Sequence, residues 1–219
     1  MMRPAFLAAG LVTLGLVWLG PLPGWAGPSF SAHMLMHLGV LAIAAPLLAL
    51  GMGSRLLPGS LSPAVPLLAS AIELLVVSLW HVPAAHEAAR ANGLVMALEQ
   101  ASFLACGLLL WCTALRDPGF ETSQQRNTAA AGVAALLITS MHMTLLGALI
   151  ALSPRELYRC APLGEGWAPI ADQQLGGALM LIATSTIYLV AGLFQLRRIL
   201  DPPRARLLRR DLARDNPGA

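Results

Sequence analysis

The chain has 219 residues, of which 57% are hydrophobic and only 11% are charged, and its net charge is +3. A mean hydropathy of +0.68 excludes an ordinary water-soluble domain, because a soluble protein of this size needs a much more charged surface. The sequence therefore predicts an all-α, polytopic membrane helix bundle, since helices satisfy their own backbone hydrogen bonds in lipid.

About six transmembrane helices are expected from the apolar segments. Proline residues fall in or beside the links between these segments, where helices are expected to stop. The segments are residues 4–20, 32–51, 63–83, 93–115, 127–152 and 173–196. The first can also be interpreted as a cleaved signal peptide, although its apolar run is long for one. Residues 1–196 form one predicted domain, and residues 197–219 form a basic tail.

Arginine placement predicts the orientation of the bundle. All 14 basic residues are arginine; eleven fall on one side of the predicted spans, and three (Arg90, Arg155 and Arg159) fall on the other. Because cytoplasmic loops are enriched in basic residues, both termini are predicted to be cytoplasmic. The tail is expected to lie along an anionic inner leaflet and not to bind nucleic acid.

The second predicted span opens with His33-Met34-Leu35-Met36-His37. Residues four apart stack on one face of a helix, so His33 and His37 should point the same way, with Met36 on that face and Met34 beside it. Imidazole and thioether groups together suit a soft metal such as Cu(I). The alternative is a helix end where polar rings meet headgroups and methionines fill gaps.

The other histidines are predicted to lie on the same, outer side. His81 and His86 stand at and just beyond the end of the third span, and His142 lies inside the fifth. An imidazole within a span needs a partner, so His142 is a candidate ligand. His81 is also typical of an interfacial ring beside Trp80, so ligand and surface roles both stay open for His81 and His86.

Two carboxylates, Glu73 in the third span and Glu99 in the fourth, lie deeper in the predicted membrane. An unpaired ionisable group is costly there, so a role in a site is the default hypothesis for both. The alternative is a protonated carboxyl that bonds to a neighbouring hydroxyl or backbone group. Cys160, in an outer loop, is interpreted either as an inert thiol or as a reactive one.

Several motifs occur in an order that resembles a known family. In chain order they are the His33–His37 block, Ala45-Pro46-Leu47-Leu48-Ala49-Leu50-Gly51, Trp80-His81-Val82-Pro83, Glu99-Gln100, Leu157-Tyr158 and Asp172-Gln173-Gln174-Leu175-Gly176-Gly177. This pattern, over roughly residues 30 to 196, resembles the multi-span CtaG family of cytochrome c oxidase assembly factors, known from caa-type oxidases.

The resemblance implies an assembly factor and not an enzyme, located as a multi-pass protein in the bacterial plasma (inner) membrane. It implies a role in forming the copper centre of oxidase subunit I. The site residues that it marks are His33, His37, His81 and Asp172, and the Gly176-Gly177 pair marks a close helix approach. Two features depart from the family: it usually has seven spans, so seven are possible here, and Gln100 stands where a histidine is expected.

The preferred hypothesis is a site that binds copper, as Cu(I) or Cu(II), near the outer membrane face. Its predicted ligands are His33, His37, His81, His142 and Met36. The residues expected to orient those ligands or to replace them are Glu99, Asp172, Met34, His86 and Glu73. The expected partners are a haem-copper oxidase subunit and the lipid bilayer, and a homo-oligomer is compatible with the sequence.

Two alternatives from other classes stay open. Paired histidines on neighbouring helices could hold a b-type haem, which would make the protein a membrane electron carrier. Less favoured is a metal-dependent membrane enzyme in which Glu99 activates water on a histidine-bound zinc, because the sequence has no HExxH motif.

Overall fold

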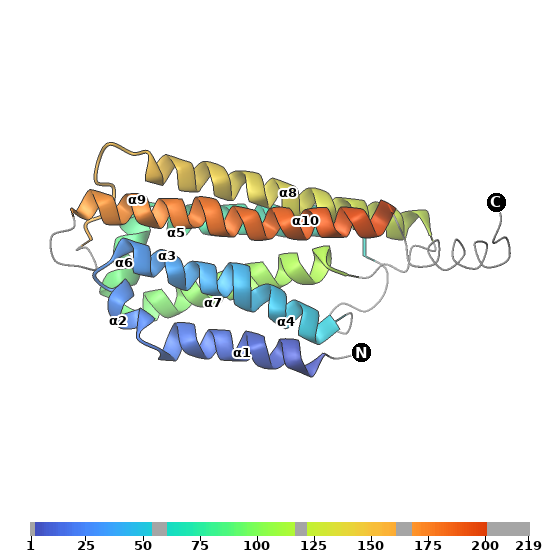
Figure 1. The fold of residues 1–219 in the computed structure, drawn as a ribbon, viewed down its shortest axis with the longest axis horizontal. Coiled ribbons are helices and arrows are strands. Elements are labelled where there is room, and N and C mark those ends of the chain that lie inside the picture. Colours follow the sequence, from blue (N-terminus) through green and yellow to red (C-terminus); the bar gives the residue numbers. More distant parts are fainter. Residues whose placement is uncertain (1–2, 54–60, 117–121, 161–167, 201–219) are drawn as a thin grey trace, which may run out of the picture.

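The computed structural model describes residues 3–53, 61–116, 122–160 and 168–200. Every regular element in these ranges is a helix, which confirms the predicted all-α class. Figure 1 shows the long helices running side by side in one elongated bundle. The elements are α1 (Pro4–Leu19), α2 (Leu22–Ala26), α3 (Phe30–Leu38), η1 (Gly39–Ala44), α4 (Ala45–Met52), α5 (Ala64–Trp80), α6 (Pro83–Ala91), α7 (Gly93–Ala114), α8 (Ser123–Ala151), α9 (Pro169–Leu179), η3 (Met180–Thr184) and α10 (Ser185–Leu200).

All six predicted apolar segments are helical, but the number of spans stays a prediction. Within the described ranges, four helices are long and apolar enough to cross a membrane, namely Phe30–Met52, Gly93–Ala114, Ser123–Ala151 and Pro169–Leu200. A fifth candidate is the pair α5 and α6, which is bent by 73°. Helix α1 is apolar but has only 16 residues. Most of the predicted tail, residues 201–219, lies outside the described residues.

The helix formed by α3, η1 and α4 contains a π turn just before Pro46. In this turn the Ala45 N–H bonds to the Val40 carbonyl, five residues back. The Leu41 carbonyl would pair next with Pro46, which has no N–H. The Trp111 indole supplies the missing donor, with its Nε1 at 2.9 Å from the Leu41 oxygen. A second π turn, η3, separates α9 from α10.

The two ends of the bundle differ in what they carry. Helix α1 begins and α10 ends at one end, whereas α2, α6 and the start of α9 lie at the other, called the α2/α6 end below (Figure 1). Because α1 begins and α10 ends at the same end of the bundle, the arrangement fits a chain that crosses the membrane an even number of times. The cytoplasmic placement of the termini stays a prediction.

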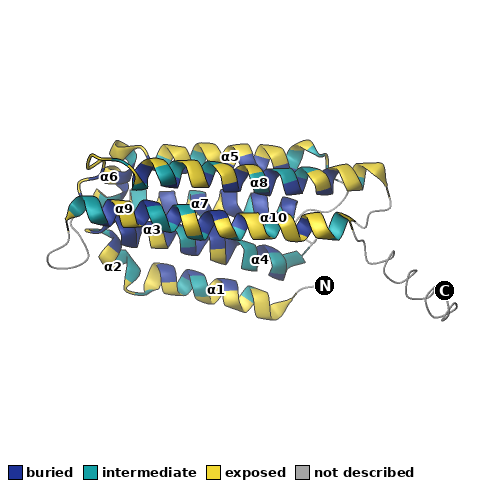
Figure 2. Cartoon of the chain, turned by 45° about the horizontal axis from the view of Figure 1, so that its top comes forward, coloured by how far each residue is buried: buried dark blue, intermediate teal, exposed yellow. Residues whose placement is uncertain are grey.

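The polarity of the bundle is opposite to that of a water-soluble protein. Leu75, Leu94 and Leu145 are all more than half exposed, while His33 and Glu99 are completely buried. Exposed residues follow the outward faces of the helices in Figure 2. An apolar exterior with ionisable groups inside is the organisation expected in lipid.

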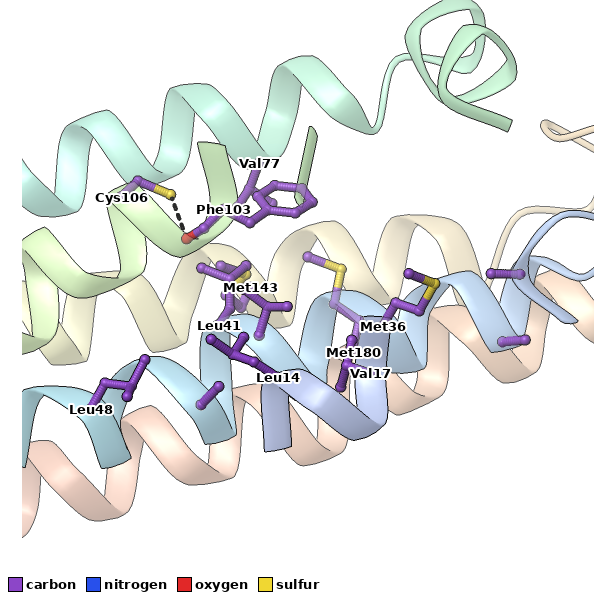
Figure 3. Close-up of a cluster of buried hydrophobic side chains, with 14 residues drawn as sticks. Leu14, Val17, Met36, Leu41, Leu48, Val77, Phe103, Cys106, Met143 and Met180 are labelled. Carbon is purple, nitrogen blue, oxygen red and sulfur yellow. Dashed lines mark hydrogen bonds between the residues drawn. The ribbon is translucent and has the colours of Figure 1, made fainter. Parts of the chain in front are cut away.

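One buried apolar cluster fixes the helices around the ionisable residues. It joins side chains from α1, from the α3–α4 helix, from α7, from α8 and from η3, and includes Leu14, Leu41, Phe103, Met143 and Met180 (Figure 3). Because protein interiors are close-packed, this cluster holds α3 and α7 in a defined relation. Those two helices supply three of the groups described next.

Candidate metal centre

Four histidines and one carboxylate meet inside the bundle near its α2/α6 end. His33 and His37 come from α3, His81 from the end of α5, His86 from α6 and Glu99 from α7. All five residues are buried, with exposed fractions from 0% to 6%. The surface role left open for His81 and His86 is therefore wrong. Residues far apart in the sequence converge on one place.

Glu99 lies between the two imidazoles of α3. His33 Nε2 lies 2.9 Å from Glu99 Oε2, and His37 Nε2 lies 3.4 Å from Oε1, the second contact without hydrogen-bond geometry. The two rings meet edge to face with centroids 4.5 Å apart, on the same side of α3 as the four-residue spacing predicts. The Gln100 amide also donates to Glu99 Oε2 at 3.4 Å. One carboxylate thus orients two imidazoles.

His86 completes a group of three possible metal donors. Its ring centroid lies 4.4 Å from that of His33. One donor atom from each of His33, His86 and Glu99 lies within 4.8 Å of the others. Metal bonds to nitrogen and oxygen are about 2 Å long, so donors around one ion lie within about 4 Å of each other. Small side-chain rotations would bring the three donors to that separation.

The tautomer of His81 follows from its hydrogen bond. Its Nδ1 lies 2.7 Å from the Val77 carbonyl, and because a carbonyl only accepts, Nδ1 carries the proton. Nε2 of a neutral ring then has a free lone pair. The Tyr158 hydroxyl donates to the His81 carbonyl at 2.8 Å, which fixes the backbone here. The His81 ring lies 5.6 Å from that of His37.

Several buried polar atoms of this cluster have no hydrogen-bond partner among the described residues. They are both ring nitrogens of His86 and of His37, Nε2 of His81, Nδ1 of His33 and Oε1 of Glu99. Leaving such atoms unpaired costs about 1–3 kcal/mol each, and native proteins rarely do so. Lone pairs without donors are what a metal ion requires, so these residues fit one.

The cluster lies close to the surface of the α2/α6 end. Tyr158 packs against His86 with ring centroids 4.8 Å apart, and stacks on Phe30 at 4.2 Å. A cavity of about 380 Å³ is lined by His86, Tyr158, Arg90 and other polar side chains of α6 and the loop after α8. His86 therefore connects the buried donors with this cavity.

The family model described as cytochrome c oxidase caa3 assembly factor (Caa3_CtaG) matches residues 2–201. The chain belongs to this family. The match confirms the predicted resemblance over nearly the whole chain. An assembly-factor family suggests a non-catalytic role. No curated protein and no solved structure matches the chain.

Three residues predicted as ligands or as replacements for them in this caa3 assembly factor are not part of the group formed by His33, His86 and Glu99. Glu73 accepts a hydrogen bond from the Tyr188 hydroxyl at 2.5 Å, as in the alternative that pairs the carboxyl with a hydroxyl. Met36 packs in the apolar cluster of Figure 3. His142 is half-buried on α8, and its neighbour Met143 is the residue that faces the interior.

Asp172, which the resemblance marks as a site residue, holds the start of α3. Its carboxylate accepts from the Phe30 backbone N–H at 2.7 Å and from the Ser29 hydroxyl at 3.0 and 3.1 Å. The Ser31 hydroxyl donates to the same carboxylate. Asp172 therefore positions the helix that carries His33, and does so through the backbone and the serines.

Sequence reasoning missed the partners of Asp172 and one methionine of the interior. Ser29 and Ser31 precede the histidine motif, and serine at a helix start is a capping signal that was available. Met180, from η3, is buried beside Met143 in the apolar cluster. Met180 follows Gly176 by four residues, which in a regular α-helix places both on one face. The π turn that begins at Met180 shifts this periodicity for the residues after it.

Proposed function

We propose that this caa3 assembly factor binds copper as its cargo through His33, His86 and Glu99, with His37 and His81 beside them. The observation that supports the proposal is the convergence of four buried imidazoles on one carboxylate, from α3, α5, α6 and α7. Such a cluster inside an apolar bundle is costly unless something satisfies it, which an ion does.

The choice of copper depends on the donors and on the family. Imidazole binds zinc, copper, iron and nickel, and among divalent ions copper forms the most stable complexes. A cytochrome c oxidase assembly factor has a reason to hold copper, because the resemblance implies action on the copper centre of oxidase subunit I. Glu99 would hold the imidazoles in place when copper arrives or leaves.

The space around the histidines favours an ion over a haem. The His33 ring lies 4.4 Å from the His86 ring and 4.5 Å from the His37 ring, so the rings contact each other. The cavity beside His37 and His81 has a volume of about 20 Å³. A porphyrin between two histidines needs far more room than this.

The arginine distribution supports a location of the cluster at the outer face of the membrane. The cluster lies near the α2/α6 end, where Arg90 of α6 donates to the Arg159 carbonyl in the loop after α8, which also contains Arg155. These are the three arginines of the less basic side. Under the positive-inside rule this end faces out of the cytoplasm, in the bacterial plasma membrane. An oxidase subunit in the same bilayer would then meet the cavity beside His86 at the outer face.

Anaerobic titration of the purified full-length protein with Cu(I), against a chromophoric chelator, tests this proposal. The wild type is expected to bind at least one equivalent, and His33→Ala and Glu99→Gln to lower the affinity about 10–100-fold. His142→Ala is the matched control, because His142 is not one of the three donors that lie within 4.8 Å of one another, and it is expected to bind like wild type. The absorption spectrum of the same sample is expected to lack a Soret band.

Two results would contradict the copper proposal. One is a wild-type protein that binds no Cu(I) under these conditions. The other is a His33→Ala variant, folded by circular dichroism, that binds as many equivalents of copper as the wild type and binds them as tightly. An intense Soret band in protein from a haem-replete host would support the electron-carrier alternative instead.

A further inference from the structure

A second group of metal donors lies behind the first, around the 20 Å³ cavity. His37 and His81 line this cavity, and so do three methionines, Met34, Met143 and Met180. These residues come from α3, α5, α8 and η3, so the arrangement is tertiary and belongs to no single motif. A cavity needs about 10–15 Å³ to hold a water-sized guest, so one small guest fits.

The two imidazoles have nitrogen atoms that lack partners. His81 Nδ1 donates to the Val77 carbonyl, so Nε2 has an unused lone pair, and this atom is buried without a partner among the described side chains and backbone. Neither ring nitrogen of His37 makes a hydrogen bond in the described part of the chain. Both residues are more than nine-tenths buried.

Met143 and Met180 belong to the same apolar cluster as Met36, but unlike Met36 they line the cavity, as Met34 does. Met34, Met143 and Met180 are all buried, and methionine is flexible enough to fill irregular gaps. Here three of them leave a cavity unfilled beside two unpaired imidazoles. Thioether and imidazole together form a soft donor set, which binds Cu(I) in preference to harder divalent ions.

We propose that His37, His81, Met34, Met143 and Met180 form a second, soft site selective for Cu(I). This inference rests on the proposed function, because it takes copper as the cargo. His37 is shared, since its Nε2 lies 3.4 Å from Glu99 of the first group and its ring borders the cavity. The outer group has nitrogen and oxygen donors, and the inner group has nitrogen and sulfur donors.

X-ray absorption at the copper edge of Cu(I)-loaded full-length protein tests the inner site. The expected result is copper–sulfur scattering in the wild type. Met143→Leu/Met180→Leu removes two thioethers and keeps similar volume. This variant is expected to lose most of the sulfur signal and about tenfold or more in Cu(I) affinity. Met141→Leu is the matched control, because Met141 lies on the same helix but is 72% exposed, and it is expected to behave like wild type.

A second probe separates the inner site from the outer one. Zn(II) prefers nitrogen and oxygen donors, so its binding is expected to survive Met143→Leu/Met180→Leu and to weaken in Glu99→Gln. Copper bound by nitrogen and oxygen alone in the wild type would overturn the inner site and leave the proposed function standing. An unchanged sulfur signal in the double variant would also overturn it. Failure of the wild type to bind any copper would overturn both proposals.

Discussion

At the scale of single residues, Asp172 shows how a buried charge can position a site indirectly, by holding the helix that carries two of its side chains. Its carboxylate accepts hydrogen bonds from the Phe30 N–H and from the hydroxyls of Ser29 and Ser31, at the N-terminus of α3. A negative charge is favourable there because the helix dipole and the unpaired N–H groups face it. α9 thereby fixes the position of the helix that carries His33 and His37.

Replacing Asp172 with asparagine is expected to destabilise the protein. The substitution turns charge-assisted hydrogen bonds into neutral ones and places an amide N–H₂ against the donors of Ser29 and Phe30. Hydrogen bonds to charged groups contribute about 1.5–3 kcal/mol, so a fall of several degrees in the thermal midpoint is expected in detergent. An unchanged midpoint together with a loss of Cu(I) binding would contradict the capping role and favour a direct role at the metal.

Cys160 is expected to react slowly in the folded protein. Burial, reinforced by Asp172 and Glu87 and opposed by Arg90, raises the pKa of this thiol to about 11. Since the thiolate is the nucleophile, alkylation at pH 8 is expected to be about 100-fold slower than for a free cysteine and to accelerate as the pH rises towards 11. Mass spectrometry of the Cys160 peptide after timed maleimide treatment measures this. Modification at the free-thiol rate would mean that Cys160 is a reactive, exposed residue.

The sequence predicted the contact between His33 and His37, but not the residues that meet them from other helices. The pairing of His33 with His37 follows from helical spacing, which is a local property. The approach of Glu99 and His86 depends on how α7 and α6 pack against α3, which no single segment specifies. On α8, either His142 or Met143 could have faced the interior. Which of the two does so depends on how the helix is rotated about its axis, and the sequence of α8 alone does not specify that rotation.

At the scale of helices, two glycines set a close approach between α8 and the α9–η3 helix. A Cβ added at Gly177 would lie 2.5 Å from the Ala151 nitrogen, and one added at Gly147 would lie 2.6 Å from the Leu181 nitrogen. The backbones of α8 and α9 therefore meet with no side chain between them, as small residues allow in membranes. This confirms the close approach that the Gly176-Gly177 motif implied.

Gly177→Val is expected to push α8 and α9 apart. Overpacking usually costs about 1–3 kcal/mol, and here the clash is with backbone, which cannot move aside as a side chain can. The expected result is a clear fall in the thermal midpoint and in the yield of folded protein. Gly15→Ala is the control, because an added Cβ at Gly15 has no neighbour within 4 Å, and it is expected to be neutral or stabilising. Equal midpoints for the two variants would show that the crossing is not tight.

The helix breaks illustrate what the sequence predicted incompletely. One span was predicted over residues 32–51, which include Pro46, and the chain does continue there as one helix, but the π turn η1 within it was not predicted. Proline removes one donor, and Trp111 from α7 replaces it. Local sequence can indicate the missing hydrogen bond, whereas the residue that replaces it belongs to a neighbouring helix.

At the scale of the whole molecule, composition determined the class and the pattern of apolar segments determined the helices. Each of the six predicted segments is helical, because a long apolar run is a direct signal of a membrane helix. The bend of 73° between α5 and α6 was not predicted, and it is the feature that brings His81 and His86 into the interior. The number of crossings depends on how such a bent pair and the short α1 meet the membrane.

The central claim is that the histidine–glutamate cluster near the α2/α6 end binds copper. An anomalous difference map at the copper edge, from crystals of the Cu(I)-loaded protein, tests it most directly. The predicted result is a peak in contact with the side chains of His33, His86 and Glu99, or in the adjoining cavity beside His37 and His81. A peak at any other place in a loaded crystal, or no peak at all, would contradict the claim.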